Sequence, residues 1–475
     1  MSVGLSRLLG LGSFWLVLAY PLWFSQASAD SVGTSRPNII VIYCDNLGYA
    51  DIEPFGSQVH RTPHVNRLAE QGRKFTHFYS ASGVCTPSRA ALMTGCYPLR
   101  VGMAITDGVV LRPVSPIGLN PLEWTIAEQL QQAGYDTAIF GKWHLGDQPE
   151  FLPTRQGFDF YEGIPYSDDM TPRPNQNWPP LPYLRQETVL EAPVDRDLLC
   201  RRLTQSACDW ISARRERPFF LYFPQCMPGS TKAPFASEGF RGKSRNGPWG
   251  DSIEEIDWSL GEMLNTLAQH QLTSNTLIIW TSDNGAPRGI PPWGSNAPLA
   301  GWGYSVAEGG MRVPCLMQWP SQIPAGTVCE ALCTTMDLLP TFAAITGTKL
   351  PEDRPLDGHN ILPLMTGNEV ASPYEAFYYY HLDQLLAVRA RQWKLYLPIP
   401  AKDNQPPRPA RLFDVVADPG ETRDLAADYP AVVAELQAST HGIREDLGDQ
   451  KNPGKQARPH GLQPNPQPLL LKNSP

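Results

Sequence analysis

The stretch from residue 83 to residue 100, GVCTPSRAALMTGCYPLR, places a cysteine at the start of a helix-like run. Pro87 and Ser88 suit the first turn of a helix, so Cys85 is predicted to lie at its N-terminus. A helix N-terminus stabilises an anion and lowers the pKa of a thiol. Arg89, about one turn further on, is placed to hold an anion or residue 85 itself. Cys85 is therefore a candidate nucleophile, while a disulfide partner, a metal ligand and a small buried residue stay open as alternatives.

Two acid–amide pairs could bind a hard divalent cation. Asp45-Asn46 and Asp283-Asn284 each follow directly on an apolar, strand-like run. Carboxylate and amide oxygens in such positions suit Ca²⁺ or Mg²⁺. Asp-Asn pairs are also common turn residues, and a turn is the simpler interpretation of either pair alone. Two such pairs at the ends of predicted core strands make a metal site an equal alternative.

A third polar cluster lies in FGKWHLG. Lys142 and His144 alternate along a segment predicted to be extended, so their side chains are expected on the same side. A cation and a titratable imidazole beside a nucleophile are the groups that cleavage of an anionic ester needs. For His144 alone, a structural histidine is the simpler interpretation. The three clusters are informative only together.

The elements that must position these clusters have the pattern of an α/β fold with a mainly parallel sheet. Short apolar runs rich in β-branched residues alternate with helical patterns. The polar clusters follow the ends of predicted strands, and ligands bind outside the carboxyl ends of strands in open α/β sheets, so a single site is predicted. The candidate core strands are 38–44, 136–140, 218–223 and 276–282. Helices are predicted to start at Thr62-Pro63, at a capping box of Thr125 and Glu128, and at Ser252-x-x-Glu255.

The pattern changes after about residue 370. EAFYYYHL, QLLAVRA, WKLYLP and RLFDVV are typical of short antiparallel strands, and a helix is predicted near 429–439. The Pro-rich, polar segment that follows is predicted to be a loose tail. The predicted organisation is a signal peptide (1–29), an α/β catalytic domain (36–370), a smaller C-terminal antiparallel α+β subdomain (371–448) and the tail (449–475).

The N-terminal segment has the layout of a secretory signal. Arg7 precedes the apolar run Leu8 to Phe24, and Ala27-Ser28-Ala29 forms a small-residue cleavage site. Pro21 interrupts a run that would need about 20 apolar residues to span a bilayer. An exported protein, periplasmic or secreted, without a stable membrane anchor is therefore predicted. The formal net charge of −8 gives no electrostatic reason to expect nucleic acid binding, and the absence of an N-x-S/T sequon favours a bacterial origin.

The chain has nine cysteines, an odd number. Export would permit disulfides, but at least one cysteine would be left over. Cys44 and Cys315 lie in apolar strand-like runs and are predicted to be buried thiols.

Taken together, the motifs resemble those of the sulfatase family. C-T-P-S-R-A-A-L-M-T-G resembles the family signature, in which the cysteine is oxidised after translation to formylglycine, and GKWHLG resembles its second signature. The resemblance covers about residues 36 to 440 and leans toward the branch of arylsulfatase A and N-acetylgalactosamine-6-sulfatase. It implies an alkaline-phosphatase-like α/β fold with a small C-terminal sheet. Further blocks in family order are RPNIIVIYCDNLGYADI, GIPYSDDM, TSDNG, EGGMRVP, TTMDLLPTFAAITG and LFDVVADPGETRDLA.

The resemblance also implies a mechanism. The hydrate of formylglycine offers two hydroxyls on one carbon: one attacks sulfur and expels the alcohol, and loss of the proton from the other releases inorganic sulfate as the aldehyde re-forms. Ca²⁺ would polarise the attacking hydroxyl and the sulfate oxygens. The implied Ca²⁺ ligands are Asp45, Asn46, Asp283, Asn284 and the modified residue 85. Arg89 and Lys142 would hold residue 85 and the sulfate, His144 would accept the proton, and Ser167 matches a sulfate-contacting serine.

Four residues, in three parts of the chain, depart from the family pattern. Asn46 stands where the metal loop usually has a second aspartate, and its amide oxygen is still a Ca²⁺ ligand. Gln225 and Gly229 occupy the block that usually carries one or two histidines, and Gly303 stands in place of a sulfate-contacting lysine. Lys232, in GSTKAP, could supply the missing charge, although an exposed loop lysine is the simpler interpretation.

The sequence thus predicts an exported sulfuric ester hydrolase that acts on a sulfated carbohydrate or another alkyl or aryl sulfate. Its expected cofactors are Ca²⁺ and formylglycine, and its expected partner is a formylglycine-generating or anaerobic maturation enzyme. Two alternatives stay open because of the departures. One is a phosphate or phosphonate ester hydrolase on the same scaffold, and the other is a non-catalytic exported carbohydrate-binding relative.

Overall fold

The structure is a computed structural model that describes residues 36–213, 217–229, 233–289, 294–369, 371–401, 406–450 and 452–471. The predicted signal peptide and Lys232 lie outside the described residues. From Arg36 onward the chain forms one compact unit, so the predicted divisions at residues 370 and 448 stay predictions.

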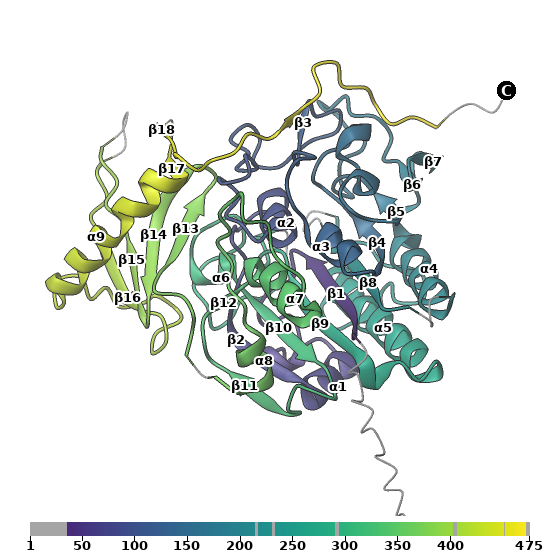
Figure 1. The fold of residues 1–475 in the computed structure, drawn as a ribbon, viewed down its shortest axis with the longest axis horizontal. Coiled ribbons are helices and arrows are strands. Elements are labelled where there is room, and N and C mark those ends of the chain that lie inside the picture. The colour runs from purple at the N-terminus through teal and green to yellow at the C-terminus, as the bar shows by residue number, and fades with distance from the viewer. Residues whose placement is uncertain are drawn as a thin grey trace, which may run out of the picture. The chain divides into compact units, whose positions relative to one another are not determined.

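A large mixed sheet forms the centre of this unit (Figure 1). Its middle strands are parallel to one another, whereas β10 is antiparallel to both of its neighbours. The spatial order is β11 (Thr327–Cys329), β2 (Arg73–Tyr79), β10 (Arg312–Gln318), β9 (Thr276–Ser282), β1 (Asn38–Asp45), β8 (Phe219–Pro228), β4 (Asp136–Lys142), β5 (Phe160–Ile164), β6 (Tyr183–Arg185) and β7 (Thr188–Glu191), and β12 (Cys333–Thr334) also pairs with β2. The predicted α/β fold is confirmed, with the four predicted core strands as β1, β4, β8 and β9.

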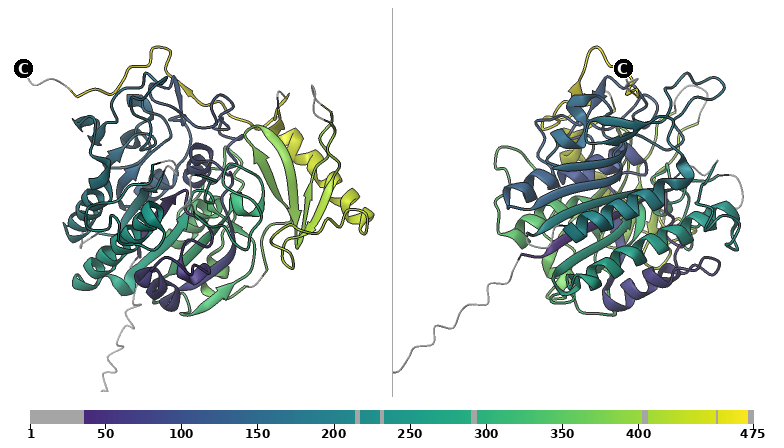
Figure 2. Two further views of the ribbon diagram at one scale, coloured as in Figure 1. Left: turned by 180° about the vertical axis from the view of Figure 1, so that it is seen from behind. Right: turned by 90° about the vertical axis from the view of Figure 1, so that its right-hand side faces the viewer.

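Helices cover both faces of this sheet (Figures 1 and 2). All eight residues of β1 are buried, and successive side chains enter opposite layers of the core. Ile39 and Val41 pack in one hydrophobic cluster, and Ile40 and Ile42 pack in the other. The first cluster includes residues of α2 (Cys85–Thr94), α3 (Ile126–Gln132) and α7 (Leu338–Thr346), and the second includes residues of α1 (Pro63–Gln71), α4 (Leu199–Ala213) and α5 (Gly247–Gln269).

Two of the three predicted helix starts are confirmed. Helix α1 begins at Pro63, and α3 begins with the predicted capping box, in which Thr125 Oγ1 accepts from the Glu128 N–H at 3.2 Å. The predicted start at Ser252 is wrong, because α5 begins at Gly247. Ser252 lies within the helix, where its hydroxyl donates to the carbonyl of Trp249 at 2.8 Å. A serine inside a helix can make such a backward bond, so it resembles a cap in sequence alone.

The C-terminal part forms a separate antiparallel sheet, as predicted. Its strands are, in order, β13 (Phe377–His381), β14 (Gln384–Ala390), β15 (Trp393–Tyr396) and β16 (Arg411–Asp414). Helix α9 (Pro430–Leu447) packs on this sheet and is longer than the predicted 429–439. In Figure 1 the helix lies on the side of the sheet away from the central strands.

The prediction of a loose tail after residue 448 is wrong for the described residues 452–471. Strand β19 (Gly461–Leu462) pairs with β3 (Ile117–Gly118) of the larger part. The Arg458 guanidinium donates to both carboxylate oxygens of Glu123, each at 2.8 Å. Figure 1 shows this yellow segment crossing back over the purple and blue part of the chain. This segment is held by contacts with residues that are distant in sequence, and amino-acid composition does not reveal such contacts.

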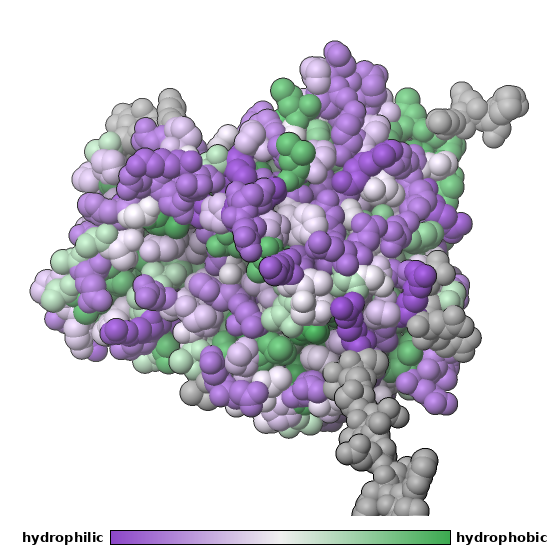
Figure 3. All heavy atoms as spheres, viewed as in Figure 1, coloured by the Kyte–Doolittle hydropathy of each residue, from purple (hydrophilic) through white to green (hydrophobic). Residues whose placement is uncertain are grey.

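No described helix is long and apolar enough to cross a membrane. On the face drawn in Figure 3, hydrophobic residues form separate areas among hydrophilic ones. All nine cysteines are free and buried in this structure, which confirms the prediction for Cys44 and Cys315.

A buried ion-pair network links the two sheets. Glu308, the first residue of α6 (Glu308–Met311), accepts hydrogen bonds from Lys394 Nζ at 3.1 Å and from the Tyr379 hydroxyl at 3.0 Å, and both donors belong to the C-terminal sheet. Burial alone would raise the pKa of Glu308, but the charges of Lys394, Arg389 and Arg312 outweigh burial and lower the pKa to about 2. The ionised carboxylate therefore stabilises the folded chain.

This network predicts a loss of stability in acid. Since the pKa of Glu308 is lower in the folded chain than the ordinary 4.5, its contribution is complete above pH about 4.5 and is lost as the pH falls toward 2. The shift corresponds to roughly 3 kcal/mol. Denaturant unfolding at a series of pH values should show this loss, and Glu308→Gln should reduce the slope between pH 4.5 and 2. Equal slopes for both proteins would contradict the assignment.

Candidate active site

The predicted polar clusters meet at one edge of the central sheet. Asp45 is the last residue of β1, Asp283 directly follows β9, and Lys142 is the last residue of β4. Strand β1 runs parallel to β9 and to β8, and β8 runs parallel to β4, so the carboxyl ends of β1, β4 and β9 lie on the same edge of the sheet. Helix α2 begins beside this edge with Cys85 as its first residue.

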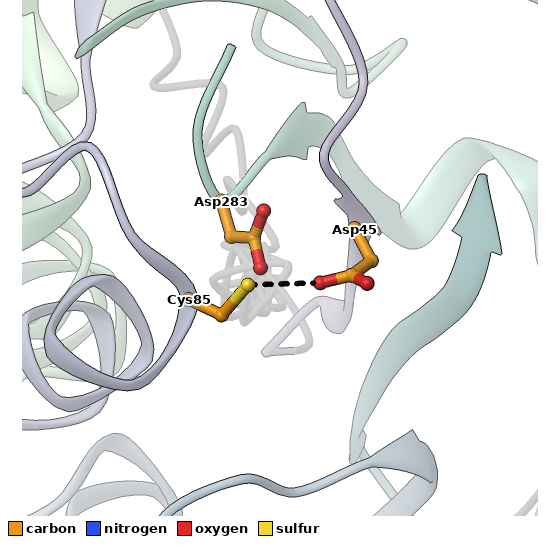
Figure 4. A group of neighbouring side chains, drawn as sticks. All are labelled: Asp45, Cys85 and Asp283. Atoms are coloured by element: carbon orange, nitrogen blue, oxygen red, sulfur yellow. Dashed lines mark hydrogen bonds between the residues drawn. The ribbon is translucent and has the colours of Figure 1, made fainter. Parts of the chain in front are cut away.

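Cys85 points toward the two aspartates, as Figure 4 shows. Its Sγ lies 3.4 Å from Asp45 Oδ1 and 3.9 Å from Asn46 Oδ1. One ligand atom each of Cys85, Asp45 and Asp283 lies within 4.8 Å of the other two. The expectation that the helix N-terminus lowers the pKa of the thiol is wrong here. Burial raises the pKa of Cys85 well above its ordinary value, and the negative charges of Asp283 and Asp45 raise it further.

Two buried cations hold the aspartates in place. Arg89 Nη2 donates to Asp45 Oδ1 at 3.0 Å and to Asp283 Oδ2 at 2.7 Å. Lys142 Nζ donates to Asp45 Oδ1 at 2.7 Å and to Ser167 Oγ at 3.2 Å. Burial alone would raise the pKa of Asp45, but Lys142 and Arg89 hold that pKa well below its ordinary value. Burial and the charge of Asp45 raise the pKa of Asp283.

The two asparagine side chains contact each other beside the aspartates. Asn46 donates from its side-chain amide to the carbonyl of Gly229 at 2.9 Å, and this fixes its Oδ1 toward the Asn284 amide at 2.7 Å. Asn284 Oδ1 and Asp45 Oδ2 are buried and have no hydrogen-bond partner among the described residues. Unpartnered carboxylate and amide oxygens are the donors that a hard divalent cation prefers. The residues present therefore fit Ca²⁺.

His144 has a different backbone from the one predicted. Its φ of 62° is left-handed, so the backbone is not extended at this residue. The prediction that Lys142 and His144 point to the same side because they alternate along a strand therefore does not apply to the His144 ring. The ring Nε2 lies 3.0 Å from the carbonyl of Leu111, which can only accept, so Nε2 carries the proton. Nδ1 is buried without a hydrogen-bond partner among the described residues. Burial lowers the pKa of His144 well below its ordinary value, and the charges of Lys142 and Arg89 add to this effect. A neutral imidazole with a free acceptor atom results.

The residues that depart from the family pattern are held by local contacts, and two of them are glycines with no space for a side chain. Gln225 donates to Ser259 Oγ of α5 at 3.0 Å. Gly229 has a left-handed φ of 67°, and a Cβ there would lie 2.7 Å from Asp168 Oδ1. A Cβ at Gly303 would overlap the carbonyl oxygen of Gly285. Positions 229 and 303 therefore exclude the larger side chains that the family pattern has there, unless the backbone moves.

The structure adds residues that the sequence did not single out. Asp168, next to Ser167, is buried and forms an ion pair with Arg196. The acidic doublet Asp168-Asp169 in the GIPYSDDM block is a sequence feature from which Asp168 could have been selected. No local sequence pattern indicates its partner Arg196. The peptide N–H of Tyr304 donates to the carbonyl of Gly83 at 2.9 Å, which brings Tyr304 to the segment that leads into Cys85.

Two protein-family models together match most of this chain. The model of the family described as Sulfatase matches residues 37–348, and that of the N-sulphoglucosamine sulphohydrolase C-terminal family matches residues 304–446. The N-acetylgalactosamine-6-sulfatase of Canis lupus familiaris is 36% identical over 79% of this chain and 74% of its own length. The steryl-sulfatase of Homo sapiens is 34% identical over 78% of this chain and 76% of its own length.

Solved structures give the same result. A structure from work on the metabolism of multiple glycosaminoglycans by Bacteroides thetaiotaomicron has a TM-score of 0.76 and 28% identity, covering 86% of this chain and 99% of its own. Ps i-CgsB in complex with k-i-k-neocarrahexaose has a TM-score of 0.71 and 30% identity, covering 86% and 93%. The expected alkaline-phosphatase-like fold is thereby confirmed. With family models over most of its length and relatives above 30% identity, the chain belongs to the sulfatase family of sulfuric ester hydrolases.

Proposed function

We propose that this enzyme hydrolyses a sulfate ester on a sulfated carbohydrate, with Cys85 converted to formylglycine and Ca²⁺ bound beside it. The observation that carries the proposal is the convergence of Cys85 with Asp45 and Asp283 at the carboxyl edge of the parallel strands. The carbohydrate as substrate is supported by the relatives. One is named for N-acetylgalactosamine 6-sulfate chemistry, and another was solved with a neocarrahexaose.

The Ca²⁺ ion would be held by Asp45, Asn46, Asp283, Asn284 and residue 85. The unpartnered oxygens of Asp45 and Asn284 support this ligand set. Bound there, Ca²⁺ would supply Lewis-acid polarisation of the sulfate oxygens. Oxidised and hydrated, residue 85 would supply the hydroxyl nucleophile that a buried thiol with a raised pKa does not.

The other residues of the site bind charge and hold a proton. Arg89 keeps the carboxylates of Asp45 and Asp283 in place through its two hydrogen bonds. Lys142 has three N–H donors, of which Asp45 and Ser167 take two, so one donor is left to bind a sulfate oxygen. His144 accepts a proton at Nδ1, the ring atom that has no partner among the described residues.

The maturation and the location of the enzyme are part of the proposal. A formylglycine-generating or anaerobic maturation enzyme acts on the CTPSR motif, and the N-terminal segment directs export to the periplasm or the medium. Maturation on an extended chain is supported by the burial of Cys85, which leaves only 3% of this residue exposed in the folded protein.

Removal of Ca²⁺ tests the metal and the reaction together. After co-expression with a maturation enzyme, mass spectrometry of the peptide containing residue 85 should show the mass loss of cysteine-to-formylglycine conversion. We expect release of inorganic sulfate from N-acetylgalactosamine 6-sulfate, loss of most of this activity on chelation with EGTA, and recovery on addition of Ca²⁺. The melting temperature should fall on chelation, because Asp45 and Asp283 lose a shared cation.

Four outcomes would contradict the proposal. An unmodified Cys85 in an active enzyme would exclude the formylglycine mechanism. Full activity in EGTA would exclude the metal. Faster hydrolysis of an aryl phosphate diester than of any sulfate ester would favour the phosphate or phosphonate ester alternative, and glycan binding without sulfate release by the modified protein would favour the binding-protein alternative.

A further inference from the structure

A short segment around Tyr304 runs directly against the two segments that carry the proposed nucleophile and metal ligands. The Tyr304 N–H donates to the carbonyl of Gly83 at 2.9 Å, and Gly83 is two residues before Cys85. Gly83 also packs tightly on this segment, because a Cβ there would lie 2.6 Å from the carbonyl oxygen of Ser305. On the other side, the Gly303 N–H donates to the carbonyl of Ala286 at 2.9 Å, just after Asn284. Tyr304 is thus placed between these two segments of the site.

The backbone of Tyr304 is in an unfavourable conformation. Its φ of 63° is left-handed, which is uncommon for an aromatic residue and costs free energy relative to glycine. Asn46 and His144 have left-handed φ values of 65° and 62° in the same site. Strained residues of this kind persist where the surroundings hold them, and they gather at functional sites. The conformation of Tyr304 therefore points to a function for its side chain.

A buried anchor from the C-terminal sheet holds this segment. Lys394 Nζ donates to the carbonyl of Val306 at 2.7 Å and to the Glu308 carboxylate at 3.1 Å. The ammonium group is fully buried, so the two contacts fix the chain on the C-terminal side of Tyr304. The Gly83 and Ala286 carbonyls fix the other side.

The side chain of Tyr304 is open to solvent, and its hydroxyl is unpaired. The residue is 41% exposed, and its hydroxyl makes no hydrogen bond to any described residue. Partial burial raises the pKa of Tyr304 above its ordinary value, and the carboxylates of Asp45 and Asp283 act in the same direction. The hydrogen bond of its N–H to Gly83 places this exposed side chain beside the segment that leads into Cys85. At neutral pH a tyrosine hydroxyl is a hydrogen-bond donor.

We propose that the Tyr304 hydroxyl donates a hydrogen bond to the sulfate group of the bound ester. This inference rests on the proposed function of the site. The family pattern has a sulfate-contacting lysine at position 303, but here the carbonyl of Gly285 fills the space that a side chain would need. The neighbouring Tyr304 would supply a sulfate contact in its place. The contact is to the sulfate, so it is shared by all sulfate esters that the enzyme accepts.

The test compares three variants of the matured enzyme. Tyr304→Phe removes the hydroxyl alone, and Tyr304→Gly also relieves the left-handed backbone. Tyr429→Phe is the matched control, because Tyr429 is 44% exposed and its ring packs on Trp393 in the C-terminal part. The measurements are kcat/KM on p-nitrophenyl sulfate and on N-acetylgalactosamine 6-sulfate, inhibition by inorganic sulfate, and the melting temperature.

Tyr304→Phe should lower kcat/KM about ten- to a hundredfold on both substrates and should weaken inhibition by sulfate, because a hydrogen bond to a charged group is lost. Tyr304→Gly should lower activity at least as much while its melting temperature stays equal or rises. Tyr429→Phe should match the wild type. A purely structural role for Tyr304 would instead lower the melting temperature of the glycine variant.

The outcomes separate this inference from the function on which it rests. An active wild type with an equally active Tyr304→Phe variant would overturn the role of Tyr304 alone. A loss confined to the sugar substrate would also overturn it, since the contact would then be to the sugar. A wild type with modified residue 85 that releases no sulfate from either substrate would overturn the proposed function and this inference with it.

Discussion

Replacing Cys85 by alanine is expected to abolish sulfate release. Without the sulfur there is no residue to convert to formylglycine, so the hydroxyl nucleophile is lost while the carboxylates and cations around it remain. Loss of a nucleophile lowers kcat by roughly 10⁴-fold or more in other hydrolases. The fold should survive, because Sγ makes contacts of only 3.4 Å and 3.9 Å to Asp45 and Asn46 and carries no ion pair. Sulfate release from the purified, metal-loaded protein measures the effect.

Cys96 gives a matched control for this variant. It is also completely buried and lies just beyond the other end of α2, where its Sγ lies 3.4 Å from the carbonyl of Thr94. Cys96→Ala removes the same atom from a similar environment, so it should change stability by about 1 kcal/mol and leave activity near that of the wild type. Activity of Cys85→Ala close to that of Cys96→Ala would show that residue 85 is not the nucleophile.

Much of the fold could be predicted because the apolar runs of the sequence are the segments that are buried in the structure. The run NIIVIYC is apolar after Asn38 and is buried on both faces as β1, and the antiparallel C-terminal strands follow a clear change of pattern. The tail could not be predicted, because the Arg458–Glu123 ion pair joins residues 335 positions apart. The start of α5 was missed because Ser252 bonds backward within a helix in place of capping it.

The location of the site could also be predicted, but its electrostatics could not. Strand-end positions were enough to bring Asp45, Lys142 and Asp283 together. The pKa of Cys85 was predicted to fall, and it rises, since the helix N-terminus acts on a thiol that is removed from water and faces two carboxylates. The place of Tyr304 depends on the hydrogen bond of its own N–H to Gly83 and on that of the Gly303 N–H to Ala286, which no sequence pattern encodes.

Removing the charge of Arg89 should damage both stability and activity. The guanidinium is fully buried and pairs with Asp45 and Asp283, so Arg89→Met would leave two carboxylates without this partner. Breaking a buried pair from one side costs about 3–5 kcal/mol, because an uncompensated charge stays in the interior. The proposed metal ligands would also lose their support, so kcat/KM should fall at least about a hundredfold. Denaturant unfolding followed by tryptophan fluorescence, together with sulfate release, measures both effects.

Added Ca²⁺ distinguishes the proposed metal site from a simple structural ion pair. Arg89→Met makes the site more negative by one charge, so Ca²⁺ should raise the melting temperature of this variant more than that of the wild type. Arg423→Met is the control, since Arg423 is 76% exposed and its pair with Asp428 is worth at most about 1 kcal/mol. If Ca²⁺ stabilises Arg89→Met no more than it stabilises Arg423→Met, the carboxylates that Arg89 holds do not bind the metal. The geometry of Asp45 and Asp283 predicts the opposite, because their shared partner in this structure is itself a cation.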